Sequence, residues 1–309
     1  MLQDNQTLLQ AQQDKFGEVF MMIDEIRKEF HNYKSNLKGK KVYSPNTKTT
    51  LQFAQCDAFA RFFCASSIMR EFELKEFSYS YYNENGDFIL FTFSANGGMS
   101  KTIISASLDD SRLFNVCKQI DNVDVVVCNP EGSKLNELFR YIFLAGKSYI
   151  LSVHKLFISN KIGFFALRNG NLKFGCNLPK MYYNLKKNKV ESRGDMMWIT
   201  NFDNGHNPNF ISTFYLTDSY EYQMLDNYNA LSVDCIKMIP MDYNGVMCVP
   251  ATIIPSINLE QFEIIGCLSS SGYDQNVTGL PKLYNDVDSR AVVNGKVLHA
   301  RILIRFRNI

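Results

Sequence analysis

One stretch, Asp121–Phe143, constrains the fold more than any other part of the chain. Val123–Val127 holds four valines, and such a short run of β-branched apolar residues is typical of a buried strand. Asn129 and Pro130 end that strand, and a glycine and a serine then lead into a helix. The apolar residues of this helix share one face: Leu135, Leu138, Phe139 and Ile142. A strand that ends in this way predicts an open α/β sheet, in which ligands bind at the carboxyl ends of the strands.

Composition is that of an ordinary globular chain, with 309 residues, 46% hydrophobic residues and 21% charged residues. The net charge of +2 gives no overall attraction to nucleic acid, so any contact with DNA requires a local basic surface. No apolar run is long enough for a transmembrane helix, and the polar, Gln-rich amino terminus is unlike a signal peptide. We therefore expect a cytoplasmic protein with no membrane partner.

The eight cysteines are scattered, without a Cys-x-x-Cys pair and without a histidine at ligand spacing. This pattern predicts reduced, small core residues and no metal site.

Several segments together resemble the EcoRI-type adenine-specific DNA methyltransferase family. Asp-Val-Val-Val-x-Asn-Pro, ending at Pro130, is similar to the catalytic loop of amino-group DNA methyltransferases, which reads Asn-Pro-Pro-aromatic. The segment 225–265 resembles the C-terminal signature of the family, as do Trp198–Asp203 and Arg301–Ile304. The resemblance runs from about Gln13 onward. It implies a doubly wound, Rossmann-like α/β methyltransferase sheet with a C-terminal α/β extension. The expected division is an N-terminal helical segment, 1–36, and a methyltransferase-like domain, 37–309.

The resemblance assigns catalysis to Asn129, Pro130, Glu131 and Gly132. A methyltransferase that acts on a base flips it into a pocket, where the Asn side-chain oxygen and the first Pro carbonyl accept hydrogen bonds from the adenine amine. In this chain Glu131 replaces the second Pro and Gly132 replaces the aromatic residue. Losing a base–aromatic stack costs about 1–3 kcal/mol. The alternative interpretation is that Asn-Pro simply closes the strand.

The cofactor positions implied by the family also differ from its pattern. The lid sequence Asp-Glu-Phe-Tyr-Thr is Asp-Lys-Phe-Gly-Glu here, and the loop after the first strand contains Lys48 but no Asp or Glu. An acidic pair after a later strand lies where the family has an acidic loop, although such a pair is also common in solvated turns. The candidate residues for S-adenosylmethionine are Asp14, Phe16, Ser44, Pro45, Asn46, Asp109 and Asp110.

A basic and aromatic segment follows later in the chain. Basic side chains between aromatic ones suit phosphate contacts and base stacking, and a solvated surface loop is the alternative. The candidate nucleic-acid contacts are Lys180, Tyr182, Tyr183, Lys186, Lys187, Lys189 and Arg193.

Hydrophobic periodicity and turn residues predict the remaining elements. The expected helices are 14–34 and 52–69. The expected strands are 40–43, 103–108 and 148–153, with hairpins formed by 77–81 with 88–93 and by 162–167 with 172–174. A tight turn at Asp242–Gly245 is expected before a strand that ends at Val249 and Pro250.

Three separate motifs, the cofactor lid, the cofactor loop and the catalytic loop, thus depart from the family pattern. The sequence predicts a pseudoenzyme of restriction-modification type that binds DNA or a protein partner, such as an active methyltransferase subunit or a second copy. S-adenosylmethionine is then expected only if the chain is active. The first alternative is an active adenine-N6 DNA methyltransferase with a divergent Asn-Pro-Glu-Gly loop. The second is a structural mimic within a defence or modification complex.

Overall fold

The computed structural model describes residues 19–46, 57–83, 85–105, 113–184, 187–205, 207–211, 220–269 and 290–307. The chain forms two compact units, one of residues 1–153 and 174–204 and the other of residues 154–173 and 205–309. Among the described helices, none is both long and apolar enough to cross a bilayer.

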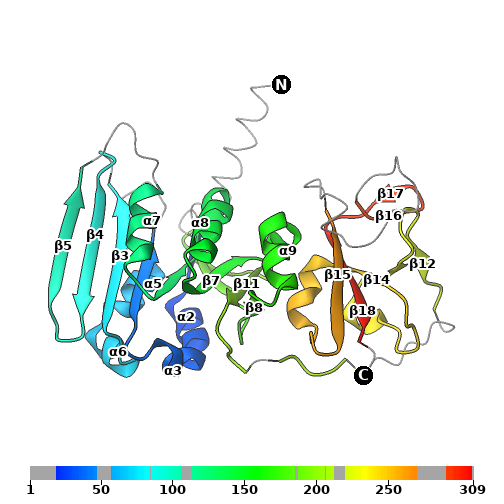
Figure 1. The fold of residues 1–309 in the computed structure, drawn as a ribbon, viewed down its shortest axis with the longest axis horizontal. Helices are drawn as coiled ribbons and strands as arrows, with labels where there is room; N and C mark the ends of the chain where they lie inside the picture. The colour runs from blue at the N-terminus through cyan, green and yellow to red at the C-terminus, as the bar shows by residue number, and fades with distance from the viewer. Residues whose placement is uncertain are drawn as a thin grey trace. The chain divides into compact units, whose positions relative to one another are not determined.

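An eight-stranded sheet organises the first unit, in the order β5-β4-β3-β2-β6-β7-β11-β8 (Figure 1). The strands are β2 (Lys41–Pro45), β3 (Glu76–Tyr82), β4 (Phe88–Ser94), β5 (Met99–Ile104), β6 (Val125–Cys128), β7 (Ser148–His154), β8 (Lys173–Phe174) and β11 (Met196–Thr200). Strands β3, β2, β6 and β7 are parallel neighbours, whereas β4 and β5 extend the sheet in antiparallel fashion. The four residues of β6 are all buried because both faces of the sheet are covered.

Helices cover both faces of this sheet. The helices are α2 (Ile23–Phe30), α3 (Lys34–Leu37), α5 (Ala58–Phe63), α6 (Ser66–Glu71), α7 (Phe114–Asp121) and α8 (Gly132–Leu144), with the 3-10 turn η1 (His31–Tyr33). On one face, Phe30 of α2 packs edge-on against Trp198, with ring centroids 5.9 Å apart. On the other face, Phe139 of α8 packs against Tyr149 at 5.2 Å. Figure 1 shows α7 and α8 on the side opposite α2 and α6. The unit is therefore a doubly wound, Rossmann-like α/β fold.

A second, smaller sheet in this unit joins β1 (Val19–Met21), β9 (Met181–Asn184) and β10 (Lys189–Ser192). Phe20 pairs with Tyr183 across the antiparallel β1–β9 ladder. This pairing corrects the predicted helix 14–34, because α2 begins only at Ile23 and Val19–Met21 forms a strand instead.

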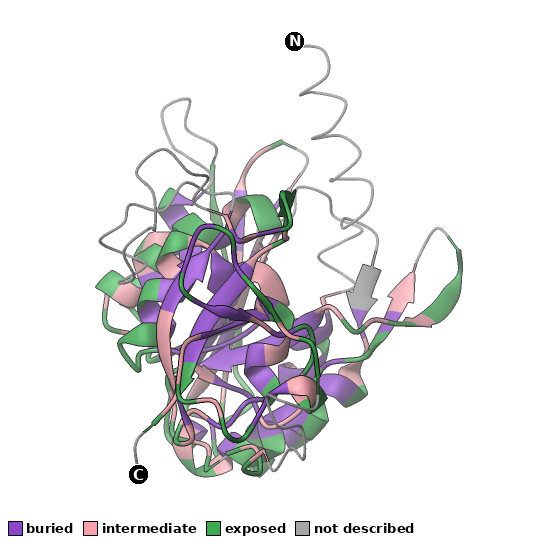
Figure 2. Ribbon diagram, turned by 90° about the vertical axis from the view of Figure 1, so that its right-hand side faces the viewer, coloured by how far each residue is buried: buried purple, intermediate pink, exposed green. Residues whose placement is uncertain are grey.

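The other unit has its own sheet, in the order β12-β13-β14-β18-β15. Its strands are β12 (Gln223–Met224), β13 (Leu231–Ser232), β14 (Met247–Pro250), β15 (Phe262–Leu268) and β18 (Arg301–Phe306), with a hairpin of β16 (Val292–Val293) and β17 (Lys296–Val297). It also contains α9 (Lys161–Arg168) and the 3-10 turns η2 (Lys155–Ser159), η4 (Ile236–Met238) and η5 (Ala251–Ser256). Leu225, Tyr228, Cys248, Leu268 and Leu303 form the centre of its core. Figure 2 shows buried residues concentrated along the central strands.

The predicted hairpin of 162–167 with 172–174 is wrong. Residues Lys161–Arg168 form α9, whose first turn is capped by the Asn160 side chain accepting from Gly163 N at 2.9 Å. Gly170 has φ +71° and ends this helix, so the Asn-Gly pair is a helix C-terminus rather than a hairpin turn.

Other boundaries also differ from the sequence expectations. The described part of the predicted helix 52–69 is two helices, α5 and α6, separated at Cys64 and Ala65. The strand expected at 103–108 is β5, which begins at Met99 and ends at Ile104. Helix α2, in the described part of the expected N-terminal helical segment, packs into the core of the first unit, and the expected division at 36/37 stays a prediction.

The elements that surround the expected catalytic loop are confirmed. Strand β6 and helix α8 follow one another as predicted, and the four apolar residues of the helix face are buried. The first strand, the hairpin of β3 with β4, and strand β7 also occur at the expected places. Strand β14 ends at Pro250, as expected.

Candidate functional site at the ends of β2 and β6

The carboxyl ends of β2 and β6 lie side by side at the point where the strand order reverses. Strand β2 pairs with β3 on one side and with β6 on the other, and both pairings are parallel. The register aligns Val42 with Val125 and Tyr43 with Val126. The chain therefore leaves β2 toward one edge of the sheet and later returns as β6 toward the other edge (Figure 1). In doubly wound folds the ligand binds at such a switch point.

Asn129, Pro130 and Glu131 form the turn from β6 into α8, and all three are half-buried. Glu131 is the N-cap residue in an extended conformation, but its side chain makes no capping hydrogen bond. Within the described chain, neither the Asn129 amide nor the Glu131 carboxylate has a hydrogen bond or an ion pair.

Gly132 opens helix α8 at the position where the family has an aromatic residue. A Cβ atom added at Gly132 would have nothing within 4 Å. A Cβ atom would therefore fit at this position, and steric hindrance does not explain why the residue is glycine. The helix itself is firmly placed, since Leu138, Phe139 and Ile142 are fully buried.

At the end of β2, three candidate cofactor residues are buried. Pro45 pairs with Ser80 of β3, and Asn46 N donates to Ser80 O at 2.9 Å. Ser44 is 1% exposed, and its buried hydroxyl makes no hydrogen bond to the described residues. The other four candidates, Asp14, Phe16, Asp109 and Asp110, lie outside the described residues.

Asp57 is a carboxylate near this site that the sequence analysis did not single out. It caps α5, with one side-chain oxygen accepting from Phe59 N at 2.8 Å and Ala60 N at 3.1 Å. Burial raises the pKa of Cys128 well above its ordinary value, and the Asp57 charge raises it further. Burial likewise raises the pKa of Tyr79 to about 12, again with a contribution from Asp57. The Asp57 carboxylate is therefore within electrostatic reach of Cys128 at the end of β6 and of Tyr79 in the middle of β3.

A sequence signal for Asp57 existed. An Asp directly before the run Ala-Phe-Ala-Arg-Phe-Phe is a typical helix N-cap. The prediction of one continuous helix from Gln52 concealed this cap.

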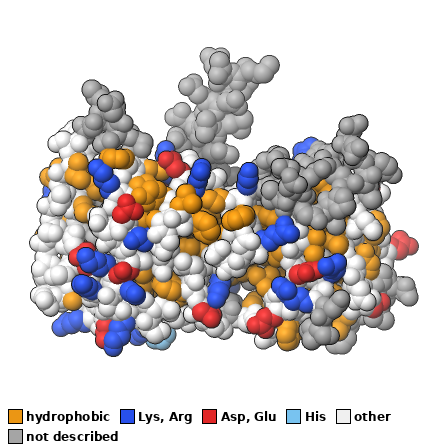
Figure 3. Space-filling model, in the orientation of Figure 1, with side chains coloured by type: hydrophobic (Ala, Val, Ile, Leu, Met, Phe, Trp, Pro, Cys, Tyr) orange, Lys and Arg blue, Asp and Glu red, His pale blue; other side chains and the backbone are white. Residues whose placement is uncertain are grey.

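The basic segment is the antiparallel hairpin of β9 with β10. Lys187 and Lys189 are each 60% exposed, and both approach Glu191, at 2.9 and 3.5 Å. Arg193 donates two hydrogen bonds to the Asp195 carboxylate, from Nε at 3.0 Å and Nη2 at 2.6 Å. Acidic residues therefore offset much of the positive charge, and Figure 3 shows basic and acidic side chains interspersed on the face in view.

The aromatic residues of this hairpin differ in exposure. Tyr182 is 1% exposed and belongs to the core of the first unit, so its ring is not available to stack on a base. This corrects the predicted stacking role of Tyr182. Tyr183 is half-buried, and its hydroxyl donates to the Asn188 side chain. Lys180 is exposed, and Lys186 lies outside the described residues.

Among the described residues, no group of three His, Cys, Asp or Glu side chains is arranged to hold a metal ion. The described cysteines are all free thiols.

Comparison with known proteins gives consistent matches. Residues 108–307 match the family described as adenine-specific methyltransferase EcoRI. The type II methyltransferase M.MgeORF184P of Mycoplasma genitalium is 28% identical, over 97% of this chain and 98% of the relative. The type II methyltransferase M.EcoRI of Escherichia coli is 25% identical over 99% and 98%, and M.MpnI of Mycoplasma pneumoniae is 25% identical over 96% and 97%. No solved structure gave a significant match.

Proposed function

This chain belongs to the family of EcoRI adenine-specific methyltransferases, and we propose that it is a catalytically degenerate member that acts by binding DNA or a protein partner. The observation that carries the proposal is the turn from β6 into α8. Asn129 and Pro130 stand at the strand end, whereas Gly132 has no side chain at the position of the stacking ring, and a Cβ atom there would have nothing within 4 Å.

Adenine methylation depends on how firmly the flipped base is held. Asn129 and the Pro130 carbonyl would accept hydrogen bonds from the amine, and these contacts orient it toward the methyl donor. Without an aromatic ring the base loses about 1–3 kcal/mol of stacking, which corresponds to roughly a 5- to 150-fold loss of occupancy. The Glu131 carboxylate, which has no partner among the described residues, also repels the phosphates of an approaching duplex.

The residues present fit S-adenosylmethionine in part. Bound there, this cofactor would supply an electrophilic methyl group on a cationic sulfur. Ser44 would offer a buried hydroxyl to it, and the Asp57 carboxylate would complement its positive charge. The loop after β2, by contrast, contributes Lys48 and no acidic residue.

One observation favours an active adenine-N6 methyltransferase as the second candidate. Asp57 brings a carboxylate from the start of α5 within electrostatic reach of Cys128 at the end of β6. It thereby replaces the acidic side chain that the β2 loop lacks. Cofactor binding alone consequently does not separate the two candidates, and methyl transfer must be measured directly.

The test uses the full-length chain with S-adenosylmethionine carrying a tritiated methyl group and genomic DNA free of adenine methylation. We expect the wild type to incorporate no more label than Asn129→Ala, which removes the amide that holds the amine. Label that depends on Asn129 would overturn the degenerate proposal and establish the second candidate.

A gain-of-function variant tests whether the changed residues at positions 131 and 132 account for the expected loss of methyl transfer. The double variant Glu131→Pro, Gly132→Phe rebuilds the family pattern at a turn where a Cβ atom on residue 132 meets nothing within 4 Å. We expect it to incorporate label about 5- to 150-fold above the wild type, since about 1–3 kcal/mol of base binding returns. Calorimetric titration of both proteins with S-adenosylmethionine shows whether each still binds the methyl donor.

A further inference from the structure

Strand β5 ends the eight-stranded sheet with every one of its six residues exposed. Met99 is 65% exposed, Ile103 56% and Ile104 41%. Figure 1 shows β5 at the free end of the sheet, beyond the helices that cover the central strands. An edge strand presents unpaired N–H and C=O groups, which proteins usually protect with charged side chains. Lys101 is the single charged residue of this strand.

One face of β5 is joined to the neighbouring strands by a row of two aromatic rings and a lysine. Tyr79, Phe91 and Lys101 stand opposite one another across β3, β4 and β5. The Tyr79 and Phe91 rings are stacked with centroids 5.1 Å apart and an interplanar angle of 10°, and the Lys101 ammonium lies 5.6 Å from the Phe91 ring centroid. Because side chains alternate along a strand, Met99 and Ile103 lie on the same face as Lys101. The exposed edge strand β5 therefore presents two apolar side chains on either side of one lysine, and the lysine packs against the Phe91 ring.

A second copy of this chain fits the template poorly. A symmetric antiparallel pairing that brings Met99 opposite Ile103 also places Lys101 opposite Lys101. Like charges directly opposite each other destabilise a strand pair. The adjacent symmetric register is centred on Thr102, and it sets Lys101 against Ile103 and leaves Met99 outside the six-residue ladder.

We propose that β5 accepts an extended strand of a different protein, with an acidic residue opposite Lys101 and apolar residues opposite Met99 and Ile103. Backbone hydrogen bonds supply the affinity, and the central charge together with its two apolar neighbours sets the specificity. This inference rests on the partner-binding part of the proposed function and not on the loss of methyl transfer.

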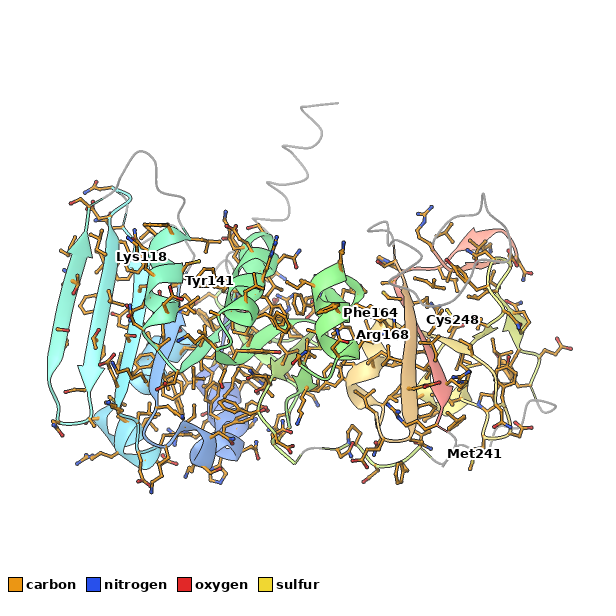
Figure 4. All side chains as sticks on the ribbon, in the orientation of Figure 1. Lys118, Tyr141, Phe164, Arg168, Met241 and Cys248 are labelled. Atoms are coloured by element: carbon orange, nitrogen blue, oxygen red, sulfur yellow. The ribbon has the colours of Figure 1, made fainter. Side chains whose placement is uncertain are left out.

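The test uses the full-length protein and the fluorescent peptide Ser-Val-Thr-Glu-Thr-Val-Ser, whose side-chain pattern is the same in both strand directions. A second peptide carries Lys in place of Glu. Titrations followed by anisotropy compare the wild type with Lys101→Glu. The matched control is Lys118→Glu on α7, where the lysine also lies over an aromatic ring, 4.1 Å from the Phe114 centroid (Figure 4).

We expect the wild type and Lys118→Glu to prefer the Glu peptide about fivefold, and Lys101→Glu to prefer the Lys peptide by a similar factor. The reversed preference is a gain of binding, which a misfolded variant cannot produce. Hydrogen exchange should show the β5 amides protected by the bound peptide.

Unchanged exchange at β5 with saturating peptide, or equal behaviour of the two charge-reversal variants, overturns the proposal. If neither peptide binds and Lys101→Glu weakens duplex DNA binding instead, the strand is a nucleic-acid contact. Methyl transfer by the wild type would refute the degenerate function without altering these peptide results.

Discussion

At the scale of single residues, Glu29 shows how one buried carboxylate organises distant parts of the chain. Its side chain accepts from the Tyr33 hydroxyl at 2.8 Å, Cys176 N at 2.9 Å and Asn177 N at 2.8 Å. Gly175 allows this approach, because a Cβ atom there would lie 2.3 Å from a Glu29 oxygen and 2.4 Å from Trp198 Cβ. The amphipathic pattern of the helix predicts that Phe30 is buried. The pattern does not predict that Glu29 is also buried.

We expect Glu29→Ala to lower the free energy of unfolding by about 3 kcal/mol, because four buried or part-buried donors on Tyr33, Cys176 and Asn177 lose their acceptor. Urea unfolding followed by the fluorescence of Trp198 measures the change. The control is Glu73→Ala, which removes an exposed ion pair with Lys38 and should cost less than about 1 kcal/mol. Equal losses in the two variants would contradict the role assigned to Glu29.

The Glu29 carboxylate also makes the stability of the protein depend on pH. Burial raises the pKa of Glu29 above 4.5, although its hydrogen bonds from Tyr33, Cys176 and Asn177 act in the opposite direction. A raised folded-state pKa contributes stability that is full below the unfolded pKa and is lost as pH rises through the folded pKa. The stability of the wild type relative to Glu29→Gln, which does not titrate, should therefore fall as pH rises above about 4.5. If the stability difference between the wild type and Glu29→Gln were the same at pH 4 and pH 8, the raised pKa of Glu29 would be contradicted.

At the scale of elements, the hairpin of β9 with β10 shows why charge counting along the sequence is insufficient. The basic residues were visible in the sequence, but their pairing with Glu191 and Asp195 depends on the strand register. Hydrogen bonds from Lys187 and Asn184 lower the pKa of Glu191 to about 2, so this residue is ionised throughout the neutral range. In a DNA complex it would compete with phosphates for Lys187 and Lys189.

If the hairpin contacts DNA, Glu191→Gln should strengthen binding, since it frees both lysines for phosphates. Each phosphate contact adds about 0.9 to the slope of log Kd against log salt concentration, so two freed lysines should make this slope steeper by about 2. Lys187→Ala should have the opposite effect, and Lys38→Ala, on an exposed lysine elsewhere in the first unit, should have none. Anisotropy titrations with a labelled duplex at several salt concentrations measure these changes. Weaker or unchanged binding by Glu191→Gln would argue against a DNA contact at this hairpin.

At the scale of the whole molecule, each of the two compact units has its own apolar core, and the chain passes between them more than once. Trp198, the single tryptophan, reports on the first unit alone. Leu303 is fully buried in the other unit, where its strand pairs with Cys248 on one side and Gly266 on the other.

We expect Leu303→Ala to destabilise its own unit by about 3 kcal/mol. Far-UV circular dichroism should then reveal an early urea transition, while the midpoint of Trp198 fluorescence stays where it is in the wild type. Ile150→Ala, a buried residue of the first unit, should instead move the fluorescence midpoint. A joint shift of both signals in Leu303→Ala would show that the two units unfold together.

Local signals in the sequence were enough to predict several elements of this fold. The valine run of β6, the apolar face of α8 and the Asn-Gly turn between β3 and β4 each carry a complete pattern of period and turn chemistry. The positions of Asn129, Pro130, Glu131 and Gly132 followed from these elements and from the resemblance to the family.

The tertiary contacts of a residue depend instead on how distant segments of the chain pack together. Asn169 and Gly170 suit a hairpin turn and a helix end equally well, and burial of Phe164 on α9 selected the helix. Asp57 lies near the site, and Tyr182 is buried, because strand order and register bring together residues that are far apart in the chain. Such long-range packing leaves no periodic pattern in the sequence, so it could be seen only in the folded structure.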